Sequence, residues 1–149
     1  MRRNNWKIVC SLSVLLLASA AVAAIGLPAF SLTASPLGQV IHPFQIAQYR
    51  LEIKRFNGFS GTVALNCRPS SPNISCVVSP SVVAVAAEGS ETPVPEILML
   101  ATPNPGTPAL GKYSIQISGT ALPRSVDGDL TSNTTVGLTV VPLVDPPSE

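Results

Sequence analysis

The most constraining feature of this sequence is a stretch at residues 57–80, in which a glycine turn, an alternating strand and two cysteines follow one another. Gly58 and Gly61 supply the turn. Side chains alternate between the two faces of a strand, so residues 62–67 have one apolar and one wetter face (Val63, Leu65 and Cys67 against Thr62, Ala64 and Asn66). The stretch predicts a core strand of an extracytoplasmic β-sandwich.

The N-terminus has the three parts of a secretory signal peptide. Arg2, Arg3 and Lys7 are positive, residues 8–17 are apolar, and residues 18–24 are small. We therefore expect residues 1–23 to be a signal helix that is removed by cleavage between Ala23 and Ala24. The alternative is an uncleaved anchor, since residues 8–25 are barely long enough to cross about 30 Å of hydrocarbon. Both readings place the protein outside the cytoplasm, as a secreted, periplasmic or cell-surface protein, and limit membrane contact to this segment.

Removal of the signal changes the charge balance of the chain. Three of the nine basic residues leave with it, and six then face eight acidic residues. The remaining cations are scattered, and only Lys54 and Arg55, with Arg50 nearby, come close together in the sequence. Nucleic-acid binding depends on a dense basic stripe that neutralises phosphates. The sequence therefore predicts no nucleic-acid partner.

The three cysteines become a pair once the signal is removed. Cys10 leaves with the signal, and Cys67 and Cys76 remain in an oxidising compartment, where we expect them to form a disulfide. A metal site built from Cys67, Cys76 and the single histidine, His42, would lack both a short cysteine spacing and a fourth ligand. The sequence accordingly predicts no metal site.

Short alternating segments, separated by turn residues, follow the signal along the rest of the chain. No 11-residue window keeps a helical period, and the chain is rich in proline. In residues 96–101 the alternation leaves two choices of buried face, either Ile97, Met99 and Ala101 or Leu98 and Leu100. The expected strands are residues 30–34 and 39–44 (one strand split near Pro43), 46–56, 62–67, 76–79, 82–87, 96–101, 112–118 and 134–141.

Seven or eight such strands within one domain predict an all-β fold, an antiparallel β-sandwich with Greek-key connections. A closed barrel is the alternative, but the uneven spacing of the strands favours two sheets. We expect residues 24–29 to be a linker, residues 30–141 to form the sandwich, and residues 142–149 to be a disordered tail.

Four motifs lie along residues 30–141, namely Phe30-Ser-Leu-Thr-Ala-Ser-Pro36, Gly58-Phe-Ser-Gly-Thr-Val-Ala-Leu65, Ser79-Pro80 and Gly111-Lys-Tyr-Ser-Ile115. In this order they resemble the immunoglobulin-like modules of bacterial secreted and cell-surface proteins. Many of these modules also carry cysteines at positions like those of Cys67 and Cys76. The chain departs from the pattern at residues 42–44, where the family usually has a turn that contains glycine. The resemblance implies an immunoglobulin-like sandwich whose role is binding or structural.

Catalysis has weak support in the sequence. Ser60 lies between glycines, but the second glycine of a nucleophile elbow is absent, and the only possible base is His42. We therefore expect no catalytic residues and no enzyme. Asp127 and Asp129 offer two carboxylates, fewer than the six to eight oxygen ligands that calcium takes, so a polar turn is expected there.

The remaining polar and aromatic motifs are read as structural. Asn73 and Asn133 fit the glycosylation pattern, but we expect both to be turn residues. Most tyrosines and phenylalanines are expected to face the core, with Tyr113 packed and its hydroxyl bonded to the backbone.

The functional expectation is a non-catalytic module without a cofactor. It would bind a protein or polysaccharide partner through sheet edges or loops such as residues 68–74 and 102–108. The alternative is a carbohydrate-binding module, against which the absence of tryptophan after the signal argues.

Overall fold

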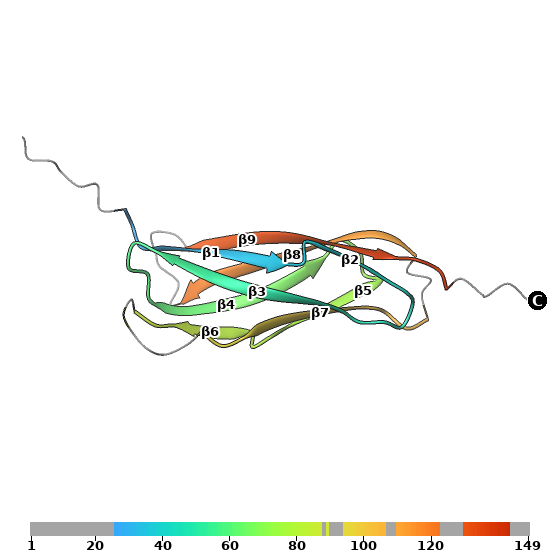
Figure 1. Cartoon of the computed structure of the whole chain (residues 1–149), viewed down its shortest axis with the longest axis horizontal. Helices are drawn as coiled ribbons and strands as arrows, with labels where there is room; N and C mark the ends of the chain where they lie inside the picture. Colours follow the sequence, from blue (N-terminus) through green and yellow to red (C-terminus); the bar gives the residue numbers. More distant parts are fainter. Residues whose placement is uncertain (1–25, 88, 90–93, 107–109, 123–129, 144–149) are drawn as a thin grey trace, which may run out of the picture.

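Figure 1 shows the computed structural model, which describes residues 26–87, 89, 94–106, 110–122 and 130–143. The predicted signal peptide, with its cleavage site at Ala23 and Ala24, lies outside these residues. So do Asp127, Asp129 and most of the predicted tail. Strand structure begins at Ala29, one residue before the predicted start of the sandwich.

The described residues contain nine strands. They are β1 (Ala29–Ser35), β2 (Gly38–Ile41), β3 (Ala47–Phe56), β4 (Gly61–Pro69), β5 (Ile74–Ser79), β6 (Val82–Val85), β7 (Ile97–Pro103), β8 (Gly111–Leu122) and β9 (Thr131–Val140). They form a four-stranded sheet in the order β1-β3-β7-β5 and a five-stranded sheet in the order β2-β9-β8-β4-β6. The all-β, two-sheet fold expected from the sequence is confirmed.

Two details of the prediction were wrong. The strands number nine instead of seven or eight, because the two parts of the split first strand join different sheets. The pairing is also not wholly antiparallel, since β2 runs parallel to β9 from Gly38↔Gly137 to Ile41↔Val140. Alternation along one segment identifies its faces but carries no information about its partner, which is why both details escaped prediction.

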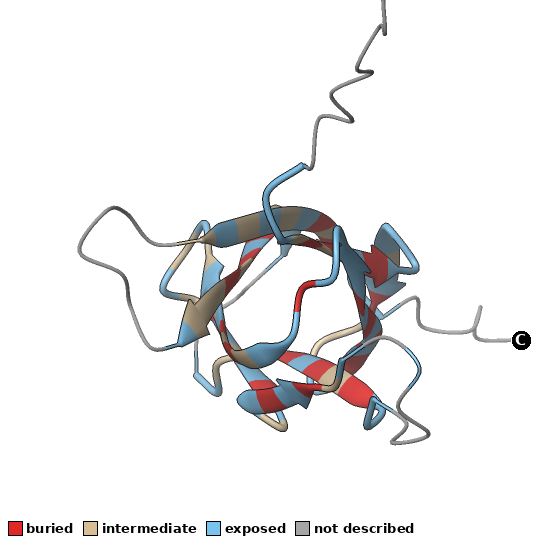
Figure 2. Cartoon of the chain, turned by 90° about the vertical axis from the view of Figure 1, so that its left-hand side faces the viewer, coloured by how far each residue is buried: buried red, intermediate tan, exposed pale blue. Residues whose placement is uncertain are grey.

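Each sheet has two edges, and the chain connects the edges of one sheet to those of the other. β1 is an edge of the four-stranded sheet and runs on into β2, an edge of the five-stranded sheet. β5 continues into β6 in the same way at the opposite side. Both changes of sheet occur at a Ser-Pro dipeptide with a cis peptide bond, Ser35-Pro36 and Ser79-Pro80. We call these two places the first seam and the second seam. Viewed along the long axis, the strands therefore form a ring (Figure 2).

The first seam lies between β9 and the β1–β2 segment. The end of β9 pairs with β2, and the Gly137 and Val141 N–H groups donate to the carbonyls of Leu37 and Ile41 beyond the ladder. The start of β9 lies beside β1, where the Leu32 N–H donates to Oγ of Ser132 at 2.9 Å. Hydrogen bonds thus join the two sheets at both ends of this seam.

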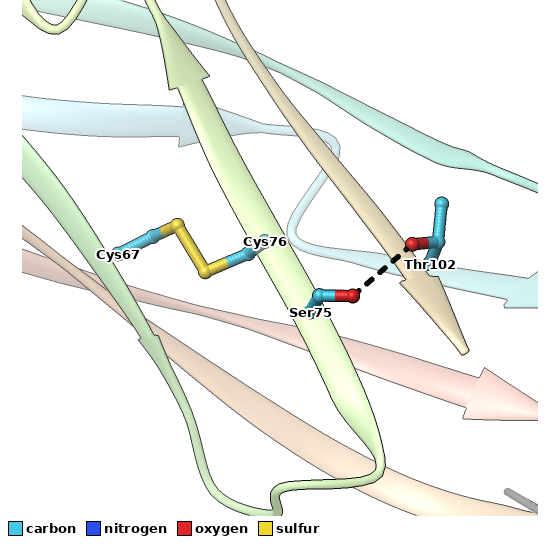
Figure 3. The surroundings of a disulfide bond; sticks show 4 residues. All are labelled: Cys67, Ser75, Cys76 and Thr102. Carbon is cyan, nitrogen blue, oxygen red and sulfur yellow. Dashed lines mark hydrogen bonds between the residues drawn. A yellow bond between two sulfur atoms is a disulfide. The ribbon is translucent and has the colours of Figure 1, made fainter. Parts of the chain in front are cut away.

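The second seam lies between β4 and the β5–β6 segment. The start of β4 pairs with β6, and the Leu65 N–H donates to the carbonyl of Ser81 at 2.7 Å. Further along β4, Cys67 forms a disulfide with Cys76 of β5, and their Cα atoms are 6.2 Å apart (Figure 3). The neighbouring Ser75 points to the other side, toward Thr102 of β7. The disulfide links the sheets where the β4–β6 ladder has ended.

The core lies between the sheets and is built by alternation along each strand, as the bands of buried residues in Figure 2 show. In β7 the buried residues are Ile97, Met99 and Ala101, which resolves the choice that periodicity left open. Gly119 of β8 faces the ring of Phe30, and a Cβ at this position would lie 3.1 Å from Cε2 of that ring. Its lack of a side chain therefore makes room for Phe30, which also packs on Phe59 at 5.1 Å between ring centroids.

Tyr49 of β3 is the largest fully buried side chain, and its hydroxyl crosses the core to the other sheet. The hydroxyl donates to the carbonyl of Gly137 in β9 at 2.7 Å. Burial raises the pKa of Tyr49, because the phenolate would lose its hydration. The folded protein therefore keeps this group neutral at a pH where the unfolded chain would ionise.

We expect Tyr49→Phe to lower the free energy of unfolding by about 1 kcal/mol at pH 7, the net value of a typical hydrogen bond. Since the folded pKa lies above the unfolded value of 10.0, stability from Tyr49 is complete below pH 10 and falls as the pH rises further. Urea unfolding at pH 7 and pH 11 should therefore show the wild-type advantage shrinking. Tyr113→Phe, which changes a less buried tyrosine, is the control. A constant difference between wild type and Tyr49→Phe at both pH values would contradict this account.

Candidate functional site

Ser60 and His42, the pair that a hydrolase would need, lie at opposite ends of the sandwich. Ser60 is exposed in the turn that follows β3, and His42 lies in the turn that precedes it. The ten residues of β3 separate the two turns, and at about 3.3 Å per residue this is roughly 30 Å. The structure therefore does not bring this serine and histidine together.

Ser60 belongs to a tight structural turn. Asn57 and Gly58 have φ values of 52° and 73°, and the Phe59 N–H donates to the carbonyl of Phe56 at 3.1 Å. Two consecutive positive φ angles define a type I′ turn, for which Asn-Gly is a preferred sequence. The turn predicted at Gly58 is confirmed.

His42 ties the β2–β3 turn to the chain that leaves β9. Its Nδ1 lies 3.3 Å from the carbonyl oxygen of Val141 and 3.2 Å from that of Pro142, so the ring donates to the backbone from this nitrogen. The backbone N–H of His42 donates to Oε1 of Gln45 at 2.8 Å. In the ranges that the structure describes, no three His, Cys, Asp or Glu residues group as metal ligands. The contacts of His42 are those of a structural residue.

The two loops proposed as binding loops meet at one end of the sandwich. The Asn104 N–H donates to the carbonyl of Asn73 at 2.8 Å, and Nδ2 of Asn104 donates to the carbonyl of Pro72. Ser75 adds a hydroxyl bond to Oδ1 of Asn104 at 2.6 Å. Residues 70–73 and 104–106 therefore form one hydrogen-bonded surface. Together with the turn at residues 42–45 and the exit at residues 141–143 we call it the loop end, on the right of Figure 1.

The most unusual residue of the loop end is Phe44. The Gln45 N–H donates to the carbonyl of His42 at 3.2 Å, which closes a turn with Pro43 and Phe44 at its centre. Phe44 has a φ of 71°, in the place where such a turn favours glycine, and its side chain is 85% exposed. A non-glycine residue in this conformation costs on the order of 1 kcal/mol, and so exposed a ring recovers little of it by packing.

Other apolar side chains at this end of the sandwich are also exposed. They are Ile46, Leu143 and Leu110, which are 59%, 65% and 49% exposed respectively. Most aromatic residues face the core as expected, since Phe30, Tyr49 and Phe59 are buried and Tyr113 packs against the core, but Phe44 and Phe56 are exposed. The sequence showed that residues 42–44 lack the glycine that immunoglobulin-like modules usually have in this turn. It did not show that Phe44 is exposed.

The remaining sequence candidates lie on the outer surfaces. Arg50 forms an exposed ion pair with Glu96 at 2.6 Å, and Arg55 donates to the carbonyl of Ala86. Tyr113 is half-buried and its hydroxyl donates to the carbonyl of Leu110 at 3.4 Å, as expected. Asn73 lies in a turn, but Asn133 does not, because it lies within β9 opposite Ser118. The prediction of a turn at Asn133 was therefore wrong.

The outer faces of the three central strands of the five-stranded sheet, β4, β8 and β9, are mainly polar. Arg68, Gln116 and Thr135 form a row across β4, β8 and β9. They line an open hollow of about 380 Å³ with Pro69, Ser70 and Ser114.

The fold resembles that of S-layer protein domains. The structure of domains 4 and 5 of the S-layer protein SbsC has a TM-score of 0.51 with this chain, 16% sequence identity, and a match over 76% of this chain. The match covers 53% of that structure, so this chain spans about half its length. At this identity the likeness concerns the fold alone.

A second structure gives a lower score. The BIgI domain of the beta protein from S. agalactiae, solved bound to CEACAM1, has a TM-score of 0.39 and 12% identity over 77% of this chain and 99% of that domain. No family model matches the sequence, and no curated protein matches it. Within the described ranges, no helix has the length and apolarity of a membrane span.

We expect replacement of Cys67 and Cys76 by alanine to lower the free energy of unfolding by about 2.5–3 kcal/mol, the chain-entropy value for a loop of this size. The second seam would then lose its covalent link beyond the β4–β6 ladder. Urea unfolding of the wild type and the double variant measures the difference. Thiol titration of the exported wild type, denatured without reductant, should find no free thiol, and two reactive thiols per chain would contradict the pairing.

Proposed function

We propose that this protein is an exported, non-catalytic immunoglobulin-like module that binds a protein partner through its loop end. Its residues 1–23 are a signal peptide cleaved between Ala23 and Ala24, or remain as an anchor. Residues 24–29 are a linker, residues 30–141 the module and residues 142–149 a tail that is disordered beyond its contact with His42 at Pro142. The protein acts in the secreted, periplasmic or cell-surface space, without a cofactor or a metal.

The strand order supports the immunoglobulin-like assignment. Without β2 and β6, the remaining seven strands form sheets in the orders β1-β3-β7-β5 and β9-β8-β4. Labelled A to G in chain order, these become ABED and GFC, the two sheets of a constant-type immunoglobulin domain with its Greek-key connections. In this interpretation β2 is the end of strand A and β6 is the end of strand D, and both ends cross to the other sheet.

The loop end is the observation that carries the binding role. Its loops are tied together by Asn104, and next to them Phe44 exposes an aromatic ring at a conformational cost. Aromatic residues are enriched among the few that dominate the energy of protein interfaces. A protein partner that covered Phe44 would bury a ring that the isolated module leaves in water.

The polar hollow on the five-stranded sheet favours a second candidate function, carbohydrate binding. Hydroxyls of Ser114 and Thr135, the amide of Gln116 and the cation of Arg68 could all bond to sugar hydroxyls there. Against it, the hollow has no aromatic platform for a sugar ring among its lining residues. The protein-binding role is therefore preferred.

The partner test uses two side chains with equal exposure at opposite ends of the sandwich. Phe44 and Leu27 are each 85% exposed. Partners are crosslinked on producing cells and identified, and Kd is measured by interferometry with purified protein. We expect Phe44→Gly to weaken binding at least tenfold without loss of thermal stability, because glycine suits the positive φ. Leu27→Gly should leave Kd unchanged.

Equal effects of the two substitutions would contradict a role for the loop end. A glycan array is probed in parallel with the same proteins. Retention on glycans that Gln116→Ala abolishes, with no protein partner, would establish the carbohydrate alternative instead.

The export proposal is tested on the protein that leaves the cell. We expect mass spectrometry to find Ala24 as the first residue, because the small residues that signal peptidase requires end there. Arg2 and Arg3 retained in a membrane fraction would favour the anchor. A chain found intact in the cytoplasm would contradict export.

A further inference from the structure

The four-stranded sheet is incomplete over half the length of β3. β1 pairs with β3 from Arg50 to Phe56, but on the other side β7 pairs with it only from Ala47 to Leu51. The last pair is Leu51↔Ile97. Among the described residues, the second half of β3 therefore has no strand partner on its β7 side.

Proline explains why the ladder stops there. Continuing the register of the β3–β7 pair by two residues would place Pro95 opposite Ile53. Proline has no N–H to donate to a ladder. No backbone hydrogen bond joins Ile53 to Val94, Pro95 or Glu96.

The backbone groups of Ile53 and Arg55 point toward this open side. The Leu32 N–H donates to Ser132 of β9, away from β3, so Leu32↔Ile53 is a non-hydrogen-bonded pair of the β1–β3 ladder. In an antiparallel ladder the N–H and C=O of both residues in such a pair point away from each other. Those of Ile53, and of Arg55 two residues on, therefore face away from β1.

An independent contact agrees with this assignment. The Asn104 N–H donates to Asn73, which extends the β5–β7 ladder through the even-numbered residues of β7. The odd-numbered residues of β7, including Ile97, then face β3. Leu51↔Ile97 is accordingly a hydrogen-bonded pair, and Ile53 is the next residue of β3 whose backbone faces the same side.

An open hollow of about 490 Å³ lies where the ladder stops. β3 lines one side with residues 50–53, and Val94, Pro95 and Glu96 line the other. The Arg50–Glu96 ion pair joins the two sides, and both side chains are more than half exposed. At the far end of β3, the Arg55 guanidinium reaches the carbonyl of Ala86. We call this hollow, with the backbone edge of Ile53 and Arg55, the β3 slot.

We propose that the β3 slot receives an extended segment of a partner protein, which adds to β3 as a further strand. This depends on the proposed interaction role of the protein but uses a surface other than the loop end. Strand addition to an exposed sheet edge draws affinity from main-chain hydrogen bonds and specificity from alternate side chains. Ile53 offers one N–H and one C=O, and Arg55 offers a second pair.

The side chains of β3 define the chemistry of the segment. Ile53 is buried, so the residue opposite it should be apolar and point inward. Glu52 and Lys54 point outward, so their antiparallel neighbours should be basic and acidic respectively. An acidic, an apolar and a basic residue in this order, without proline, form the expected centre of the segment.

The first measurement is amide hydrogen exchange of the free mature protein. We expect the Ile53 amide to exchange at least tenfold faster than the Leu51 amide, because only Leu51 donates to β7. Pro95→Val restores an N–H opposite Ile53 and should slow Ile53 exchange toward that of Leu51. Equal protection of Ile53 and Leu51 in the wild type would overturn the proposal.

The second measurement is selection from a displayed library of linear heptapeptides with the acidic, apolar and basic centre fixed. Selected peptides should slow exchange of the Ile53 and Arg55 amides, and Pro95→Val should weaken their binding at least tenfold. Pro105→Val, a proline change in the loop end, is the matched control and should leave binding unchanged. A library without binders, or binders insensitive to Pro95→Val, would overturn the proposal.

The two proposals fail separately. Phe44→Gly should leave peptide binding to the β3 slot unchanged. If peptides bind the slot but Phe44→Gly does not weaken binding of the cellular partner, the loop-end proposal fails and the slot remains. If Phe44→Gly weakens partner binding while the library gives no slot binder, the slot fails and the loop end remains.

Discussion

The structure depends on how the edges of its two sheets are satisfied. An edge strand presents unpaired backbone groups, and proteins protect such edges because another chain can pair with them. Here the chain itself crosses from one sheet to the other at both sides. β1 is an edge of the four-stranded sheet and continues into β2, an edge of the five-stranded sheet, and β5 continues into β6 in the same way. Where the β4–β6 ladder ends, the disulfide between Cys67 and Cys76 holds the sheets together. Closure of both seams anchors the strands on either side of the described turns at residues 42–45 and 70–73.

This closure explains why the loop end can be preorganised. Its loops follow β2, β4 and β7, and the loop after β4 spans the second seam to reach β5. The hydrogen bonds of Asn104 then join this loop directly to the loop after β7. A surface that is already ordered loses little conformational freedom when a partner binds. The rigid sandwich and the exposed Phe44 thus serve the same proposed role.

The sequence showed which face of most strands is buried, but it did not show which strands pair with one another. Alternation of Tyr49, Leu51 and Ile53 located β3 nearly to the residue, because its outer positions from Gln48 to Lys54 are all polar. Alternation says nothing about which strand lies alongside, so the crossing of β1 to β2 and of β5 to β6 could not be read from the residues. The sequence also could not predict that the β3–β7 ladder stops before Pro95, because the missing N–H of a proline matters only once the residue opposite it is known. At residues 42–44 the sequence showed an unusual turn, but the conformation of Phe44 required the structure.

The start of β1 and the end of β9 lie at opposite ends of the sandwich (Figure 1), and this placement has a mechanical consequence. Tension along this axis would pull β2 and β9 in opposite directions along their length, and the parallel pairs from Gly38↔Gly137 to Ile41↔Val140 would carry it in shear. Their hydrogen bonds would bear the load together instead of opening one after another, as those of a hairpin pulled from its open end do. Residues between Cys67 and Cys76 would stay out of any extension, since the disulfide closes that loop covalently.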